Sequence, residues 1–244
     1  GNRPFSFPIC AFPIPTDVLH PYRPLYFLFM KAIIFDCDGV LVDSEKLSCS
    51  SWLPVLERHG IQAELAEIET FIGKSDQAVV DYFHNKLGID LPREIYDERE
   101  CEYFALAREH LQTFSSLRTV LSALQDRGIP LAVASSGRME KIHFSLHHVG
   151  LESFFTTVCS AIEVERGKPP PDLFLLAADR LGVAPNACAV VEDSVFGIRA
   201  ACSAGMLPLG FTSSYPAPVL REAGAHTIFT EYAEFLPLFQ AEFL

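Results

Sequence analysis

Two aspartates stand one residue apart where an apolar stretch of the sequence ends. Residues 31–35, KAIIF, predict a buried strand, and Asp36 and Asp38 follow it directly. Because close carboxylates repel each other, such a pair either shares a proton or is stabilised by a cation. Gly39 can then bring the backbone close to a ligand and expose amide groups to an anion. By itself, the motif is equally compatible with an ordinary acidic turn.

Three later segments also place polar groups directly after apolar stretches or in stiff loops. Ser135 and Ser136 offer a hydroxyl and helix N-terminal amides to phosphate oxygens, although an N-cap is the simpler role. Lys168 lies in the proline-rich loop GKPPPD, which can hold one cation in place. Glu192 and Asp193 end the stretch CAVVED. Each feature alone is also compatible with a helix cap or a solvated surface group.

The elements that must position these residues alternate along the chain from residue 31. The expected strands are 31–35, 129–135, 156–160, 187–192, 207–211 and 226–229. The expected helices among them are 117–127, 138–149, 172–182, 194–204 and 217–223. This alternation predicts an α/β fold with a Rossmann-like parallel sheet. Such sheets bind ligands at the carboxyl ends of their strands, where the polar segments fall.

One region, 45–110, contains no pattern of a buried strand. Its helical patterns lie at about 45–59, 64–71, 75–87 and 92–110. We therefore expect a helical domain inserted after the first strand into an α/β core made of 30–44 and 111–244.

Residues 1–29 differ from the rest of the chain, with six prolines, many aromatic residues and almost no charge. The apolar piece before Met30 is too short to span a bilayer, and no clear secretory signal is present. We expect Met30 to be the natural start and the leader to be an upstream extension. The alternative is an arm that packs on the core or on a partner.

Composition limits the kind of partner. The chain has 244 residues and a net charge of −12, without a basic stripe, which argues against nucleic acid binding. A small phosphorylated ligand remains compatible, because it needs only a few local cations and amides. The seven cysteines are irregularly spaced and form no CxxC motif, which predicts reduced thiols in a cytoplasmic protein. No sequence feature indicates an oligomeric state.

Taken together, four segments resemble the motifs of the haloacid dehalogenase-like hydrolases, in particular their capped phosphatase and phosphomutase branch. In chain order they are FDCDGVLVDS, VASSGR, GKPPPD and VVEDSVFGIRAA. The resemblance covers about residues 31–240, and the helical insertion stands where this family carries its cap domain. It implies a Mg²⁺-dependent phosphatase of a small phosphorylated metabolite, such as a sugar or sugar-acid phosphate.

The resemblance also implies a chemical role for each acidic residue. Asp36 would be the nucleophile that forms an aspartyl-phosphate. Asp38 would protonate the leaving oxygen and then deprotonate the attacking water. Mg²⁺ would be held by Asp36, the Asp38 carbonyl and Asp193, with Glu192 as a further ligand or as an acid behind the ligands. The aspartate at position 38 is absent from the branch that cleaves carbon–halogen bonds, so it favours phosphoryl chemistry.

The remaining candidate residues would bind the substrate. The resemblance implies that the phosphoryl oxygens contact the backbone or side chains of Gly39, Ser135, Ser136 and Lys168. Lys74 lies in a loop similar to the family's specificity loop, and Arg138 opens a helix near the phosphate. Both could contact substrate, and both are equally well explained as surface residues.

Three alternatives to a phosphatase have discriminating features in the sequence. β-Phosphoglucomutases of the family carry a histidine where this chain has Ser48, and an asparagine where it has Arg138-Met139. These departures favour hydrolysis over phosphoryl transfer to a sugar. A catalytically silent binding protein would be expected to lose at least one of the four charged motif residues, and all four are present. A receiver-type phosphorylation switch would need no helical insertion.

Overall fold

The computed structural model describes residues 30–72 and 75–240. Lys74 and the leader 1–29 lie outside the described residues. The chain forms two compact units, and the described part of the first comprises 30–41 and 114–240. The second unit is Val42–Thr113, three residues longer at each end than the insertion expected from the sequence.

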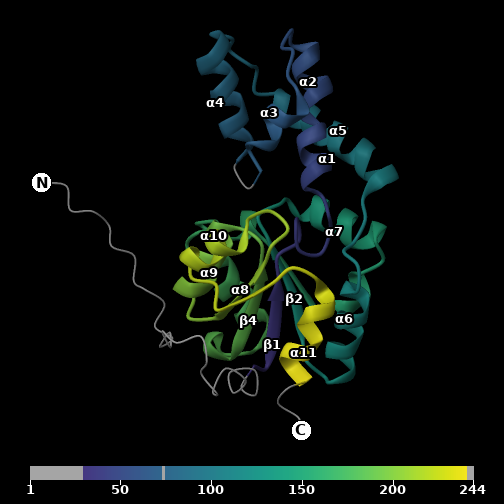
Figure 1. The fold of residues 1–244 in the computed structure, drawn as a ribbon, viewed down its shortest axis with the longest axis vertical. Helices are drawn as coiled ribbons and strands as arrows, with labels where there is room; N and C mark the ends of the chain where they lie inside the picture. The colour runs from purple at the N-terminus through teal and green to yellow at the C-terminus, as the bar shows by residue number, and fades with distance from the viewer. Residues whose placement is uncertain (1–29, 73–74, 241–244) are drawn as a thin grey trace, which may run out of the picture. The chain divides into compact units, whose positions relative to one another are not determined.

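The first unit is built on a parallel sheet (Figure 1). In the described residues its strands are β1 (Ala32–Phe35), β2 (Leu131–Ser135), β3 (Thr157–Ser160), β4 (Cys188–Glu192), β5 (Leu207–Phe211) and β6 (Thr227–Phe229). They lie in the order β3-β2-β1-β4-β5-β6, and every neighbouring pair is parallel. This is the Rossmann-like sheet that the alternating pattern predicts. The strand order reverses beside β1, which is where such sheets bind ligands.

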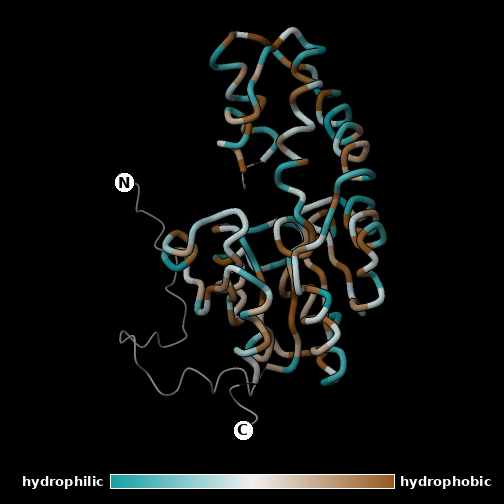
Figure 2. Tube along the Cα trace, turned by 45° about the vertical axis from the view of Figure 1, so that its right-hand side comes forward, coloured by the Kyte–Doolittle hydropathy of each residue, from teal (hydrophilic) through white to brown (hydrophobic). Residues whose placement is uncertain are grey.

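Alternating side chains of the strands pack against helices on one face of the sheet. Ile34 of β1 belongs to a hydrophobic cluster with Ala132 and Val190 of the two flanking strands. Leu173 and Phe174 of α8 (Asp172–Leu181) and small residues of α9 (Val195–Ser203) complete this cluster. All four residues of β1 are buried, so the side chains on both faces of this strand are covered. Figure 2 shows the strands of this unit as hydrophobic segments.

Aromatic side chains cluster at the β5–β6 end of the sheet. The rings of Phe211 and Phe229 stack with centroids 5.1 Å apart, and Tyr232 lies 4.9 Å from Phe211. Phe114 meets Phe211 edge-on. The cluster extends to Phe235, the first residue of α11 (Phe235–Gln240), a helix that the sequence pattern did not predict.

The remaining predicted helices of the first unit are present with small differences at their ends. They are α6 (Leu117–Asp126), α7 (Met139–His148) and α10 (Ala217–Ala223). The predicted and observed ends of these helices differ by one residue at most. Each of these helices follows a strand or precedes one, as expected of βαβ units.

The second unit is helical. Its helices are α1 (Glu45–Ser50), α2 (Trp52–Arg58), α3 (Leu65–Glu69), α4 (Asp76–Leu87) and α5 (Ile95–His110). The sequence predicted one helix over 45–59, but the structure interrupts it at Ser51. Pro54 explains the interruption, because proline lacks an N–H and its ring clashes with the carbonyl four residues earlier, that of Ser50. The unit has its own core around Trp52 and Phe83.

Two expectations about the whole chain can be compared with the described residues. The six cysteines among them are all free, as expected of reduced thiols. None of the described helices has the length and apolar character needed to cross a membrane.

Candidate active site

Asp36 extends β1 beyond its last residue. Its backbone N–H donates to the carbonyl of Val191 on β4, with N···O 3.0 Å, so the position of Asp36 is set by the sheet itself. The chain then turns sharply, and the amides of Val40 and Leu41 both donate to the carbonyl of Cys37. Asp36 is 8% exposed, so the strand delivers a nearly buried carboxylate to the carboxyl edge.

Gly39 lets this turn pass close to the neighbouring strand end. Its φ is +73°, a backbone conformation that residues other than glycine rarely adopt. A Cβ placed there would lie 2.0 Å from a carboxylate oxygen of Asp193. We expected Gly39 to approach a ligand. The structure adds a second role, because the missing side chain allows the ends of β1 and β4 to touch. The approach to a ligand stays a prediction.

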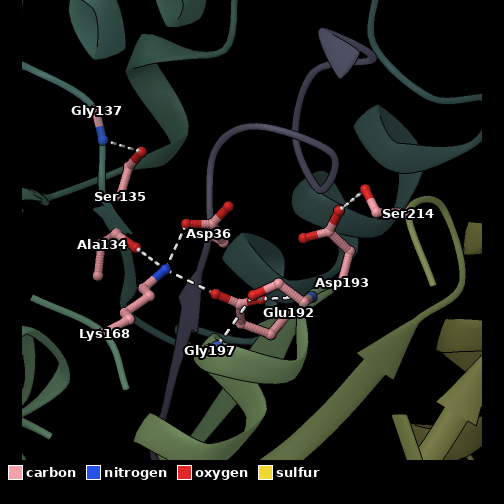
Figure 3. Close-up of polar contacts among 10 residues, drawn as sticks. Asp36, Ala134, Ser135, Gly137, Lys168, Glu192, Asp193, Gly197 and Ser214 are labelled. Atoms are coloured by element: carbon pink, nitrogen blue, oxygen red, sulfur yellow. Dashed lines mark hydrogen bonds and ion pairs between the residues drawn. The ribbon is translucent and has the colours of Figure 1, made fainter. Parts of the chain in front are cut away.

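Lys168 connects three strand ends. Its Nζ lies 2.5 Å from Asp36 Oδ1, 2.7 Å from Glu192 Oε1 and 3.0 Å from the carbonyl of Ala134 (Figure 3). An ammonium group has three N–H donors, and each of them has an acceptor here. The Lys168 side chain is 5% exposed, and its Nζ lies 4.8 Å from the centre of the Phe174 ring. The cation is therefore held in one place.

The electrostatic balance at Asp36 depends on burial and on this lysine. Burial raises the pKa of Asp36 to about 7, and attraction to Lys168 opposes part of the rise. Burial acts to lower the pKa of Lys168, but Asp36 and Glu192 outweigh it, so the pKa lies above its usual range. Lys168 is therefore a cation, and Asp36 gains further stability as a carboxylate from any second cation bound beside it.

Glu192 has contacts that fit the second of its two expected roles, that of an acid behind the metal ligands. Its Oε1 accepts from Lys168, and its Oε2 accepts from both the amide and the hydroxyl of Ser194, each at 2.8 Å. A Cβ at Gly197 would lie 1.7 Å from Oε1, so the carboxylate packs against the first turn of α9. Both oxygens thus orient Lys168 and hold the start of α9, and a direct bond from Glu192 to the metal stays a prediction.

Asp193 is oriented by two hydroxyl groups that the sequence analysis missed. Ser213 and Ser214 donate to its Oδ2, Ser213 at 3.1 Å, and Ser213 also donates to the carbonyl of Gly39. In Figure 3 the other oxygen of Asp193 points toward the side on which Asp36 lies. The two serines follow β5. A search for polar residues at the end of every predicted strand would have found them.

The end of β2 supplies the predicted hydroxyl. Ser135 is buried, and its Oγ accepts from the amide of Gly137 at 3.1 Å (Figure 3). Ser136 and Arg138 are exposed, and Arg138 is the N-cap residue of α7.

Lys141, in the first turn of α7, was not identified from the sequence. Its Nζ lies 2.9 Å from Asp38 Oδ1, so each of the two opening aspartates has a lysine of its own.

The donor set at this edge fits a small hard cation. The carboxylates of Asp36 and Asp193 and the carbonyl of Asp38 are oxygen ligands of the kind Mg²⁺ prefers, and magnesium commonly uses only one or two carboxylates plus water and substrate. The raised pKa of Asp36 shows that Lys168 alone does not offset the cost of burying this carboxylate. Within 30–72 and 75–240, no group of three or more His, Cys, Asp or Glu side chains is arranged to hold a metal.

Comparison with known proteins gives the family. The model described as "Haloacid dehalogenase-like hydrolase" matches residues 33–210. Hexitol phosphatase A from Escherichia coli is 35% identical over 79% of this chain and 88% of its own length. Fructose-1-phosphate phosphatase YqaB, also from E. coli, is 32% identical over 71% of this chain and 92% of its own. A putative β-phosphoglucomutase from Thermotoga maritima has a TM-score of 0.75 at 29% identity, with 87% of this chain and 99% of that one covered.

These similarities agree with the fold. The matched segment contains both opening aspartates, Ser135, Lys168 and the pair that ends β4. The chain belongs to the haloacid dehalogenase-like hydrolase family, as an enzyme of the phosphoric monoester hydrolase type.

Proposed function

We propose that this protein is a Mg²⁺-dependent phosphatase of small phosphorylated carbohydrates that acts through an aspartyl-phosphate intermediate. The observation that carries the proposal is the position of Lys168, bonded to Asp36 and Glu192 and buried at the meeting point of three strand ends. A carboxylate held by a buried cation at the switch point of a parallel sheet is suited to attack an anionic phosphoryl group. The carbohydrate substrate class is supported by the names of the similar hexitol and fructose-1-phosphate phosphatases.

In the first half-reaction, a carboxylate oxygen of Asp36 bonds to phosphorus as the bond from phosphorus to the leaving oxygen breaks. The carboxyl group of Asp38 gives its proton to that leaving oxygen, which departs as an alcohol. Lys168 stabilises the charge that gathers on the transferring group. Mg²⁺ bound by Asp36, Asp193 and the Asp38 carbonyl would neutralise further phosphoryl charge.

In the second half-reaction, the carboxylate of Asp38 takes a proton from water as the water oxygen bonds to phosphorus. The phosphorus–oxygen bond to Asp36 breaks, which restores the aspartate and releases inorganic phosphate. Ser135, at the end of β2, and the nearby amides at the start of α7 would donate to phosphoryl oxygens. In this proposal the helical unit Val42–Thr113 serves as the family's cap.

A panel of phosphate esters tests the proposal. p-Nitrophenyl phosphate, fructose 1-phosphate, hexitol phosphates and β-glucose 1-phosphate are incubated with the wild-type protein, with Mg²⁺ and with EDTA. We expect release of inorganic phosphate that requires Mg²⁺ and disappears in Asp36→Asn. Asp126→Asn, an exposed aspartate at the end of α6, is the matched control and should remain fully active. Absence of Mg²⁺-dependent release with every ester would favour a silent binding protein.

A phosphomutase is the second candidate, because of the similarity to the putative β-phosphoglucomutase. Ser48 stands where the mutases carry a cap histidine, and its Oγ accepts from Arg99 within the second unit. A hydroxyl engaged in this way provides no general base for activating a sugar. Product analysis of the β-glucose 1-phosphate reaction distinguishes the two activities, since a mutase yields glucose 6-phosphate and a phosphatase yields glucose.

A further inference from the structure

Asp38 is paired with a cation that belongs to none of the four sequence motifs. Lys141 lies 103 residues further along the chain, and its Nζ is 2.9 Å from Asp38 Oδ1. The side chains of Lys141 and Asp38 are 14% and 22% exposed, so the pair is largely shielded from solvent. An ion pair of this kind is stronger than an exposed surface pair, because water screens it less.

Gly137 lies beside both side chains. A Cβ built on Gly137 would lie 3.8 Å from Asp38 Oδ2, 3.7 Å from Lys141 Cδ and 3.5 Å from Ser135 Oγ. The bare backbone at Gly137 is therefore the point around which the acid, the lysine and the phosphate-binding hydroxyl converge. Lys168 makes its three contacts elsewhere, with Asp36, Glu192 and the carbonyl of Ala134.

We propose that Lys141 is a positioning residue that orients Asp38 for proton transfer to the leaving oxygen of the substrate. This inference rests on the proposed phosphatase function. Lys141 contacts Oδ1, and the other oxygen, Oδ2, lies near Gly137. When the proton moves to the leaving oxygen, Asp38 becomes a carboxylate. The ammonium group of Lys141 stabilises this new charge more strongly than it stabilises the neutral acid, which lowers the barrier.

The proposal predicts a dependence on the leaving group. A sugar alkoxide must be protonated as it leaves, whereas p-nitrophenolate is stable without a proton. A residue that acts through the general acid therefore matters for sugar phosphates and matters little for p-nitrophenyl phosphate. A residue that binds the phosphate, or that only maintains the fold, affects both substrates equally. The ratio kcat/KM covers substrate binding and the first half-reaction, and it includes no event after the first product leaves.

The experiment compares Lys141→Met and Lys141→Arg with wild-type protein in the presence of Mg²⁺. We expect Lys141→Met to lower kcat/KM for the preferred sugar phosphate by about 10²-fold, within the usual contribution of general acid catalysis, and to change kcat/KM for p-nitrophenyl phosphate far less. Lys141→Arg keeps the charge and should restore most of the activity on the sugar phosphate. Glu140→Gln, an exposed neighbour in the same turn of α7, is the matched control and should behave as wild type.

Two outcomes would overturn the inference while leaving the phosphatase proposal intact. They are an equal loss on both substrates in a folded Lys141→Met protein, and no loss on either substrate. If Lys141→Met does not fold, equal losses on both substrates in the Lys141→Arg protein would overturn the inference instead. A wild-type protein that hydrolyses neither substrate would overturn the proposed function and this inference with it.

Discussion

Among the described residues, each unit of the molecule buries a cation against aromatic rings. These two cations differ in how completely they are hydrogen-bonded. Lys168 in the first unit donates to three acceptors and lies over the ring of Phe174. Arg99 in the second unit lies 6.0 Å from the centre of the Trp52 ring and 5.8 Å from that of Tyr103. Both side chains are at least nine-tenths buried.

The bonding of Arg99 is incomplete by comparison. It donates to the hydroxyl of Ser48, and its Nη1 lies 3.6 Å from Asp76 Oδ2, while its Nε has no hydrogen-bond partner among the described residues. A cation whose donors all have acceptors is held in one position, as a catalytic site requires. A partly bonded cation is positioned mainly by packing. The comparison predicts that the core site is sensitive to changes of charge and that the Arg99 cluster is tolerant of them.

The largest expected effect is that of Asp36→Asn, which removes the nucleophile from the fully bonded site. Asparagine keeps the size and one oxygen that can accept from Lys168, so the fold should persist. We expect phosphate release to fall by about 10⁴-fold or more, as for loss of a nucleophile in other hydrolases. Steady-state kinetics and circular dichroism test this. Turnover within tenfold of wild type would exclude Asp36 as the nucleophile.

Lys168→Met should come next, with effects on both activity and stability. Loss of the cation leaves Asp36 and Glu192 close together, and removal of one partner from a buried pair costs about 3–5 kcal/mol of unfolding free energy. Activity should fall by about 10²–10³-fold. Urea unfolding and phosphate release measure the two losses.

The stability loss in Lys168→Met should depend on pH. Burial raises the pKa of Asp36 above its unfolded value, so the folded state binds more protons and stability falls as pH rises through the folded pKa. Without Lys168 to oppose the rise, the folded-state pKa of Asp36 lies higher still, and the fall in stability continues to higher pH. We therefore expect the loss relative to wild type to be larger at pH 8 than at pH 5. A loss that is independent of pH would contradict the assigned contact between Lys168 and the two carboxylates.

Magnesium should stabilise the first unit by a smaller amount. At a concentration one hundred times its Kd, a ligand that binds only the folded state adds about 2.7 kcal/mol. Asp193→Asn should remove most of this gain, whereas Asp126→Asn should leave it unchanged. Thermal unfolding at several Mg²⁺ concentrations measures the gain, and an equal rise in Tm for wild type and Asp193→Asn would place the ion elsewhere.

The smallest effect is expected for Arg99→Met. Methionine fills the space between the rings of Trp52 and Tyr103 and removes a buried charge that is incompletely bonded. Replacement of buried ionic groups by apolar residues of similar volume is often neutral or stabilising. We expect the unfolding free energy to change by less than about 1 kcal/mol. A loss as large as that of Lys168→Met would show that the two cations are equivalent and would break the comparison.

Much of the fold follows from local patterns in the sequence. Short apolar runs bounded by turn residues predict both ends of every strand of the sheet to within two residues. The prediction succeeds because β-branched and small apolar residues in short runs are typical of buried parallel strands. The break at Ser51 could also have been predicted, since Pro54 stands four residues after Ser50. α11 was missed because it is a short helix next to an aromatic cluster that forms only when Phe229 and Tyr232 meet Phe235.

The candidate site divides in the same way. Residue type and order along the chain identify the charged groups at the ends of β1 and β4 and in the loop that carries Lys168, because parallel strands bring their carboxyl ends to one edge. The contacts of Lys141 with Asp38, and of Ser213 and Ser214 with Asp193, join residues far apart in sequence. The periodic pattern of apolar residues in the sequence does not predict which side chains at that edge of the sheet contact each other.

The sequence by itself therefore determined the strands, most of the helices, the insertion point and the chemical types of the residues at the edge of the sheet, since these depend on local propensity and spacing. The tertiary structure alone decided how the charges are paired. It turned Glu192 toward Lys168 and α9, and it gave Asp38 a lysine from α7. The physical reason is that a buried charge must find its partner among the groups that packing brings within reach, and packing is a property of the whole fold.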